Sequence, residues 1–244
     1  MGLLGAIHAL QGRMVSTQAL AEQGIHIEQE VLQETVGSQD QVCAAYGGFN
    51  HVLFSTSGDI SVRPVILPAS RMTELNDSLM LVYTGIKRTA ASVAGTYVPN
   101  LDARKRQLRL IREMVDEALG ILCGSGDLGD FGRLLNESWM AKRSLSPTVT
   151  CSAIDAMYEA ALAGGALGGK ITGAGGGGFL LLFVPPERRH AVREKLHDLL
   201  HVPFKFEPAG SRVIFYDSEP DYAAAEADQD GRRLVPVREM EDGE

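Results

Sequence analysis

A dense run of glycines carries the clearest chemistry in this sequence. Every residue but one from 173 to 178 is glycine, and Lys170 stands just before the run. Such a run is costly in backbone entropy, so it is favoured where the main chain must approach another group closely. A phosphate held by successive backbone amides is a common partner of that kind. The run therefore predicts a nucleotide-binding enzyme, with a tight connection between a helix and a strand as the alternative. The predicted nucleotide-binding residues are Lys170, Gly173, Ala174, Gly175, Gly176, Gly177 and Gly178.

Two known phosphate-binding motifs nearly fit this region but fail on their context. The G-x-G-x-x-G fingerprint fits residues 173–178, yet it should follow a strand and open a helix. Here the apolar run Phe179–Val184, which has the character of a strand, comes afterwards. The P-loop pattern fits from Gly164 to Lys170, but Ile171 stands where Ser or Thr is required. Neither motif is assigned.

A second candidate for chemistry is Asp40. Ser38 with Gln41 three residues later has the form of a capping box, which predicts that a short helix begins here and runs toward Tyr46. An ionised carboxylate is favoured just inside a helix N-terminus. Phosphoryl transfer needs a group that orients the attacking hydroxyl, and Asp40 suits that role. The alternative is that Asp40 only supports the start of the helix.

The elements that must position these residues follow from hydrophobic spacing and turn residues. In the clearest helix, Leu108, Ile111 and Val115 share one face. The first helix, with Leu3, Leu4, Ile7 and Leu10, is expected to be largely buried. Helices are predicted at about 3–12, 17–32, 38–46, from 89 onward, 102–123, 128–142, 148–163 and 187–200. Strands are predicted at 49–55, 60–67, 79–84, 179–184 and 212–216, the first two as a hairpin. The order predicts an α+β fold, with helices on a mostly antiparallel sheet.

Composition narrows the class of protein. The 244 residues suffice for one large or two small domains with a real core. The segment 218–244 holds nine acidic and three basic residues, so it supplies most of the net charge of −8 and is expected to be a disordered tail. No basic field for nucleic acid and no apolar run long enough for a membrane is present in the sequence. Three scattered cysteines and the absence of a basic leader at Met1 predict a cytoplasmic protein.

Four segments together resemble the galactokinase, homoserine kinase, mevalonate kinase and phosphomevalonate kinase (GHMP) superfamily. The resemblance extends from Met1 to about Tyr216 and is greatest to the D-glycero-D-manno-heptose 7-phosphate kinases and their sugar-kinase relatives. The segments that carry it are His26–Glu30 with Val36–Phe49, Tyr83–Arg88, Ser138–Leu145, and Ile154–Tyr158 running through Gly165–Lys170 into the glycine run.

The resemblance implies a two-lobed fold with ATP and a sugar between the lobes. Residues 1–75 would form part of a ribosomal-S5-like N-terminal lobe, and residues 76–217 a ferredoxin-like C-terminal lobe. The glycine run would be the family's third motif, which lies against the triphosphate. The implied partners are ATP and a small-molecule sugar phosphate, and a homodimer is left open.

The resemblance also assigns roles to single residues. Asp40 would face the acceptor hydroxyl, and Glu28 would lie near Mg²⁺, which needs only one or two carboxylates besides phosphate oxygens. Thr84 and Arg88 would contact the sugar or its phosphate. The alternatives are an ordinary surface role for Glu28 and Arg88 and a solvated Lys170. The implied activity is transfer of the ATP γ-phosphate to the anomeric hydroxyl of a heptose 7-phosphate.

One motif of the superfamily is missing. The sequence contains no Pro-x-x-x-Gly-Leu-Gly-Ser-Ser segment, whose amides and helix N-terminus hold the ATP phosphates in these kinases. The chain is therefore expected to be an N-terminally truncated kinase with impaired activity. The alternatives are another GHMP sugar kinase, or a non-catalytic remnant that binds a sugar phosphate or a partner chain.

Overall fold

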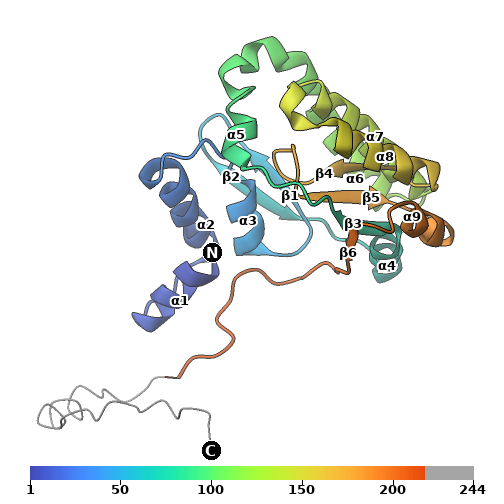
Figure 1. The fold of residues 1–244 in the computed structure, drawn as a ribbon. Helices are drawn as coiled ribbons and strands as arrows, with labels where there is room; N and C mark the ends of the chain where they lie inside the picture. The colour runs from blue at the N-terminus through green and yellow to red at the C-terminus, as the bar shows by residue number, and fades with distance from the viewer. Residues whose placement is uncertain (218–244) are drawn as a thin grey trace, which may run out of the picture.

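The computed structural model describes residues 1–217, except the side chains of residues 90, 99 and 100. Its first part consists of three helical segments and a hairpin (Figure 1). These are α1 (Gly2–Leu10), α2 (Thr17–His26) continued by a π-helix (Ile27–Val31), α3 (Gln39–Tyr46), β1 (Asn50–Phe54) and β2 (Ile60–Pro64). The two strands are antiparallel, with Asn50 opposite Pro64 and Phe54 opposite Ile60. The predicted hairpin is therefore confirmed.

The second part is built on a four-stranded antiparallel sheet. Its helices are α4 (Ala69–Ser78), α5 (Ala90–Ala94), α6 (Lys105–Cys123), α7 (Gly129–Arg143), α8 (Ser152–Ala163) and α9 (Arg189–Lys195), with 3-10 turns at Val98–Arg104, Pro147–Val149 and Pro186–Arg188. Its strands are β3 (Leu79–Tyr83), β4 (Gly168–Ile171), β5 (Phe179–Phe183) and β6 (Leu200–Val202), in the spatial order β4-β5-β3-β6. A strand–helices–two strands–helix–strand sequence in this order is the ferredoxin-like arrangement. The predicted α+β class is confirmed.

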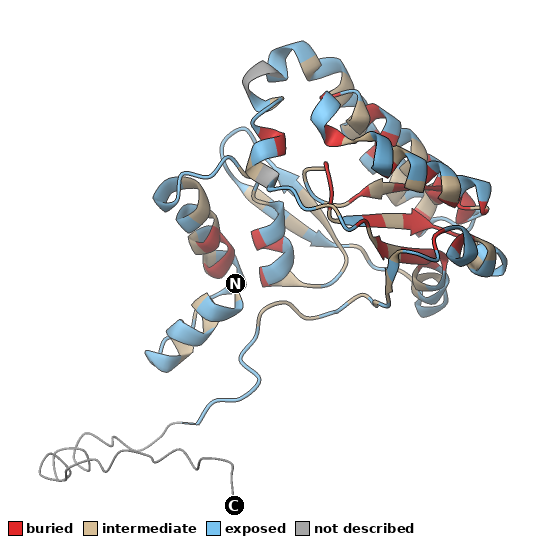
Figure 2. Cartoon of the chain, viewed as in Figure 1, coloured by how far each residue is buried: buried red, intermediate tan, exposed pale blue. Residues whose placement is uncertain are grey.

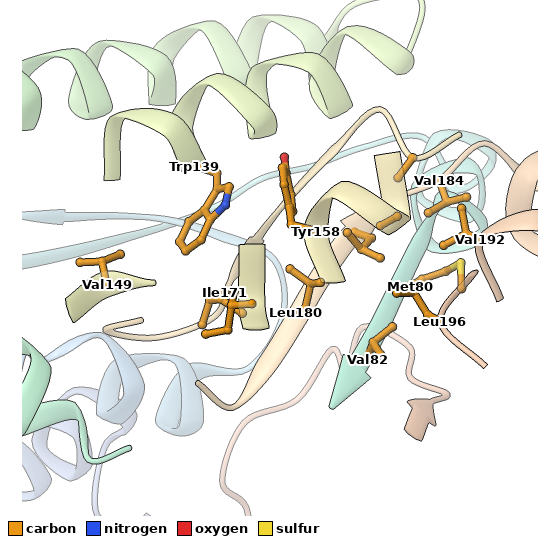
Figure 3. Packing of buried hydrophobic residues seen from close by; sticks show 14 of the residues in the cluster. Met80, Val82, Trp139, Val149, Tyr158, Ile171, Leu180, Val184, Val192 and Leu196 are labelled. Atoms are coloured by element: carbon orange, nitrogen blue, oxygen red, sulfur yellow. The ribbon is translucent and has the colours of Figure 1, made fainter. Parts of the chain in front are cut away.

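Alternate residues of the central strands supply two hydrophobic clusters, as the two-residue period of a strand requires. Val82, Leu180 and Leu182 belong to the larger cluster, which also contains Trp139 from α7 and Tyr158 from α8 (Figure 3). Leu79 and Phe183 belong to the second cluster, with Leu75 from α4 and Leu122 and Leu128 from the ends of α6 and α7. Because both sets are buried, β3 and β5 are apolar along their whole length.

A third cluster holds the N-terminal elements together. It contains Ala21, Val42 and Ala45, with Val52 and Val62 of the hairpin packed against them. The segment 207–211, which follows β6, crosses the C-terminal end of α3. There the Gly48 amide donates to the Glu207 carbonyl at 2.7 Å, and the Ser211 amide donates to the Ala44 carbonyl at 2.9 Å. Helix α3 is thus tied to the end of the C-terminal part of the chain.

Four expectations about the elements were wrong or incomplete. Helix α1 forms, but none of its residues is buried, and Leu3 and Leu10 are 77% and 86% exposed (Figure 2). Residues 212–216 form no strand, and Leu200–Val202 pairs with β3 instead. Helix α4 and strand β4 were not predicted, so the glycine run follows a strand and not a helix. Ser38 is the N-cap residue of α3, but its side chain makes no capping hydrogen bond, and its Oγ instead accepts one from Gln29 Nε2 at 3.2 Å.

Two expectations concern the surface and the end of the chain. Within residues 1–217, no helix is both long and apolar enough to cross a membrane. The predicted acidic tail, 218–244, lies outside the described residues.

Candidate active site

The glycine run forms the connection of the β4–β5 hairpin. Pairing of these strands begins at Gly168 with Phe183 and ends at Ile171 with Leu180, which leaves residues 172–178 as the loop. Four loop residues have φ between 67° and 113°, the left-handed region that glycine alone enters at little cost. They are Gly173, Gly175, Gly176 and Gly178. The loop conformation therefore depends directly on the glycines.

Three glycines are also required because the loop lies against other backbone. A Cβ atom on Gly177 would come within 2.5 Å of the Ile86 carbonyl oxygen, and one on Gly175 within 2.8 Å of the Val149 carbonyl oxygen. On Gly176, a Cβ atom would meet the Thr148 oxygen at 3.0 Å. The sequence-based argument for close approach was thus right about the need for glycine. For these three positions, the neighbouring group is this chain's own backbone.

Hydrogen bonds hold the second half of the loop in place. The Gly176 amide donates to the Val149 carbonyl at 2.7 Å, and the Gly178 amide donates to the Ile86 carbonyl at 2.8 Å. The Gly178 carbonyl accepts from the Thr84 amide at 2.9 Å and from the Thr84 Oγ1 at 2.8 Å. Thr84 is 3% exposed, and its Oγ1 also accepts from the Ile86 amide. The buried Thr84 side chain therefore supports the conformation of the loop. The predicted role of Thr84 was a contact with the sugar or its phosphate.

The remaining amides of the loop are free to bind a ligand. Within residues 1–217, no hydrogen-bond acceptor is found for the amides of Gly173, Ala174, Gly175 and Gly177. Gly173 is exposed, and a Cβ atom there would touch nothing within 4 Å. Unpaired amides on a left-handed glycine turn are donors of the kind that bind an anion.

Two lysines lie beside the loop. Lys170 is on β4, and Lys142 is in the last turn of α7, from which its Nζ donates a hydrogen bond to the Gly173 carbonyl. Burial lowers the pKa of Lys142 to about 8, and the positive charge of Lys170 acts in the same direction. Burial also lowers the pKa of Lys170. The alternative of a solvated Lys170 is therefore not what the structure shows, because Lys170 is partly buried with a second cation close by.

Arg88 completes this side of the site. It follows β3 in an exposed segment, and its Cγ lies 3.5 Å from the position that a Cβ atom on Gly176 would take. The guanidinium has no carboxylate partner among the residues that the structure describes. It is therefore available to an anionic group near the loop.

Asp40 and Glu28 lie in the N-terminal elements. Asp40 is in the first turn of α3, is exposed, and makes no hydrogen bond or ion pair with another described residue. Burial and the charge of Asp40 raise the pKa of the Cys43 thiol, one turn further along the helix.

Glu28 is held by a residue that sequence reasoning missed. The Gln41 side chain is 5% exposed, and its Nε2 donates to the Glu28 carboxylate. The other end of that amide, Gln41 Oε1, is buried without a hydrogen-bond partner among the described residues. Turning the amide over would place its oxygen against the carboxylate, so this orientation is fixed by charge. Gln41 thus fixes the position of the Glu28 carboxylate through its amide nitrogen.

Glu28 supplies a single carboxylate, the type of ligand that a hard cation prefers. Mg²⁺ prefers oxygen ligands and is bound through one or two carboxylates together with substrate phosphates. No group of three His, Cys, Asp or Glu side chains arranged to hold a metal is found in residues 1–217. A magnesium ion at Glu28 would therefore depend on the phosphates of its substrate, as the sequence-based assignment assumed.

The predicted residues fall into two groups. The glycine loop, Thr84, Arg88 and Lys170 meet at one end of the C-terminal sheet, near α5 (Figure 1). Asp40 and Glu28 belong to the N-terminal elements. Lys142 was missed, although it lies in a segment that carried the family resemblance. Its role depends on a contact with a residue 31 positions away, which spacing does not indicate.

Comparison with known proteins places this fold in a class. Residues 110–201 match the family described as GHMP kinases, C terminal. A heptose 1-phosphate kinase structure from Bacteroides thetaiotaomicron has a TM-score of 0.65 at 24% identity, covering 88% of this chain and 61% of that one. The galactokinase structure from Lactococcus lactis, complexed with galactose, has a TM-score of 0.60 at 19% identity and covers 86% and 64%. The chain has the GHMP kinase fold, and residues 110–201 form a GHMP kinase C-terminal domain.

The curated relatives are sugar kinases. The chain is 30% identical over 173 residues to D-glycero-alpha-D-manno-heptose 7-phosphate kinase from Campylobacter jejuni, covering 70% of this chain and 51% of that protein. It is also 30% identical over 198 residues to the L-fucokinase/L-fucose-1-P guanylyltransferase of Bacteroides fragilis, covering 78% and 20%. The sugar-kinase resemblance seen in the sequence is thus confirmed. The chain spans about half the length of the first of these relatives.

Proposed function

We propose that this chain is a sugar kinase that transfers the γ-phosphate of ATP to the anomeric hydroxyl of D-glycero-D-manno-heptose 7-phosphate. The glycine loop carries the proposal, because its unpaired amides lie beside two lysines that have no acidic partner among the described residues. That combination suits a polyphosphate. The identity to a heptose 7-phosphate kinase supports the choice of sugar.

Each group has a role that follows from its position. Phosphoryl transfer depends almost entirely on positioning and charge stabilisation. The unpaired amides of Gly173, Ala174, Gly175 and Gly177 would hold phosphate oxygens. The exposed Asp40 carboxylate would accept a hydrogen bond from the sugar hydroxyl that attacks. Glu28 would hold Mg²⁺, which neutralises charge on the phosphates when bound. Arg88, beside the loop, would contact the 7-phosphate.

We make further proposals about the lobes of the protein, the activity of this chain and its location. The residue ranges 1–75 and 76–217 are proposed as the two lobes. We also propose that the 244 residues on their own are weakly active, because the sequence contains no second glycine-rich phosphate motif. Three cysteines that are free in the structure support a cytoplasmic location. ATP and the sugar phosphate are the proposed partners.

Phosphate transfer by the purified chain tests the proposal. Product formation from ATP should be greater with heptose 7-phosphate than with galactose or fucose. Replacing Asp40 with Asn should lower the rate about 10²–10⁴-fold, because the hydroxyl loses its acceptor. Asp116→Asn, which changes an exposed carboxylate on α6, is the matched control and should leave the rate unchanged. Glu28→Gln, compared with the exposed Glu30→Gln, tests the magnesium role in the same assay.

Binding decides the result if transfer is too slow to measure. Calorimetry with a non-hydrolysable ATP analogue and with heptose 7-phosphate should detect both ligands. Failure to bind either one contradicts the proposal. Binding of the sugar phosphate alone would favour the non-catalytic alternative, and equal rates with several sugars would favour a different GHMP sugar kinase.

A further inference from the structure

Two positive charges beside the glycine loop lack a negatively charged neighbour among the described residues. Lys142 and Lys170 both lie partly buried against the glycine loop. No carboxylate oxygen of residues 1–217 lies within 4.0 Å of either ammonium nitrogen. Bringing two like charges together in a partly desolvated place is unfavourable unless another group compensates them. Nothing in the described part of the chain does so.

The acidic residue in this neighbourhood is already neutralised. Asp155, on α8, forms an ion pair with Arg143 at 2.8 Å and accepts a hydrogen bond from Thr150 Oγ1 at 2.6 Å. Arg143 follows Lys142 directly in the sequence. Asp155 pairs with Arg143, whereas Lys142 has no carboxylate partner among the described residues. Lys142 on α7 and Lys170 on β4 are thus both left without a carboxylate partner in residues 1–217.

The loop adds neutral donors to the same place. The contact between Lys142 Nζ and the Gly173 carbonyl brings the ammonium beside the exposed turn that begins at Gly173. The amides of Ala174 and Gly175 follow directly, and neither has an acceptor in residues 1–217. Ammonium groups and unpaired backbone amides in one neighbourhood are the donors that a phosphate requires.

We infer that Lys142, together with Lys170 and the free loop amides, forms a binding subsite for a phosphate group, and that Lys142 contacts that phosphate directly. The inference rests on the proposed kinase function. The phosphate belongs either to a nucleotide or to the sugar phosphate, which offer the same chemistry to the two lysines. When the phosphate leaves, both ammonium groups lose their anionic partner. Binding of the phosphate is therefore coupled to the positive charge of the two lysines.

Calorimetric titration of the 244-residue chain tests the subsite. The titrants are inorganic pyrophosphate, a non-hydrolysable ATP analogue, and heptose 7-phosphate. Lys142→Met should weaken binding of pyrophosphate about 10- to 100-fold, the effect of losing one charge-assisted hydrogen bond. Lys142→Arg should recover part of the affinity. Lys195→Met, at the exposed end of α9, is the matched control and should bind as the wild type does.

The titrants also separate the two sources of the phosphate. Weaker binding of the ATP analogue alone assigns the subsite to the nucleotide, and weaker binding of heptose 7-phosphate alone assigns it to the sugar. A loss of pyrophosphate binding without any phosphate transfer would support the subsite while contradicting the proposed kinase activity. Unchanged affinity for all three titrants in a folded Lys142→Met variant would overturn the inference, as would a wild-type chain that binds none of them.

A chemical measurement on the wild-type chain covers the case in which the variant does not fold. An amine-reactive ester labels unprotonated lysines, and mass spectrometry reports the extent at each site. Saturating pyrophosphate should protect Lys142 from labelling at least about fivefold, because the bound anion favours the protonated ammonium and covers it. Lys195 should be labelled equally with and without the anion. Equal labelling of Lys142 in both conditions would contradict the direct contact.

Discussion

At the scale of single residues, the site depends on contacts that join distant parts of the sequence. Thr84 and Gly178 are 94 positions apart, and Lys142 and Gly173 are 31 apart. The sequence could indicate the glycine loop and the helix that begins near Asp40, because both are local patterns. It could not show that Thr84 would be buried beneath the loop, since its hydroxyl acquires that role only through the fold.

The altered pKa of Lys142 gives a prediction about stability at alkaline pH. The pKa falls from its ordinary value of 10.5 to about 8 in the folded chain. Between these values the unfolded chain binds more protons than the folded chain, so the free energy of unfolding rises with pH. After allowance for solvent screening, we expect Lys142 to contribute about 1 kcal/mol between pH 7.5 and 9.5. Urea unfolding at these two pH values measures this change in the free energy of unfolding.

Other groups titrate in the same range, so the comparison must be made between variants. Lys170 has a lowered pKa and acts in the same direction as Lys142. Cys43 and Tyr158 have raised pKa values and oppose it, Tyr158 only at higher pH because its pKa rises from 10.0 to about 12. Lys142→Met should reduce the rise in unfolding free energy, whereas Lys195→Met should keep it. An equal rise in both variants would exclude Lys142 as its source.

At the scale of elements, the sequence patterns predicted the helices and strands more accurately than the pairing between strands. The amphipathic spacing of α6 and the hairpin β1–β2 are confirmed, because each is decided within one short segment. The edge strand was misplaced, since residues 213–216 form an apolar, strand-like run but find no partner among the described residues. Leu200–Val202 takes the position beside β3 instead. Strand pairing is decided by the whole fold, which the local pattern does not contain.

The glycine loop allows a prediction at this scale. A methyl group on Gly177 would meet the Ile86 carbonyl oxygen at 2.5 Å, although the φ of Gly177 itself lies outside the left-handed region. Gly177→Ala must therefore displace the loop from the segment after β3, and should destabilise the chain by about 1–3 kcal/mol. Phosphate binding should weaken with it. Thermal unfolding and pyrophosphate titration measure the two effects.

The control for that prediction is a glycine with open space around it. Gly37 has nothing within 4 Å of its Cβ position, and its φ is not in the left-handed region. Gly37→Ala should leave both the stability and the phosphate affinity within error of the wild type. If Gly177→Ala behaved in the same way, the close packing of the loop against Ile86 would not be required for the site.

At the scale of the whole molecule, the surface of α1 and of the segment 211–217 is unusually apolar. These two elements line a hollow of about 850 Å³. Ile214 and Phe215 are 86% and 80% exposed, and Leu10 and Met14 are similarly uncovered (Figure 2). The sequence predicted a buried first helix on the ground of its apolar residues, and the structure leaves it outside. An apolar surface of this kind promotes association between molecules.

We therefore expect the purified chain to self-associate through this surface, in line with the homodimer that the sequence left open. Light scattering coupled to size-exclusion chromatography should show an apparent mass that rises with protein concentration. Replacing Ile214 and Phe215 together with Ser should move the mass toward that of the monomer, because both side chains would no longer gain from leaving water. Ile66→Ser, at a position 87% exposed after β2, is the control and should behave as the wild type. A double variant that associates as strongly as the wild type would show that the surface lined by α1 and 211–217 does not drive association, and would direct attention to the edges of the β1–β2 hairpin, where backbone groups are open to pairing with another strand.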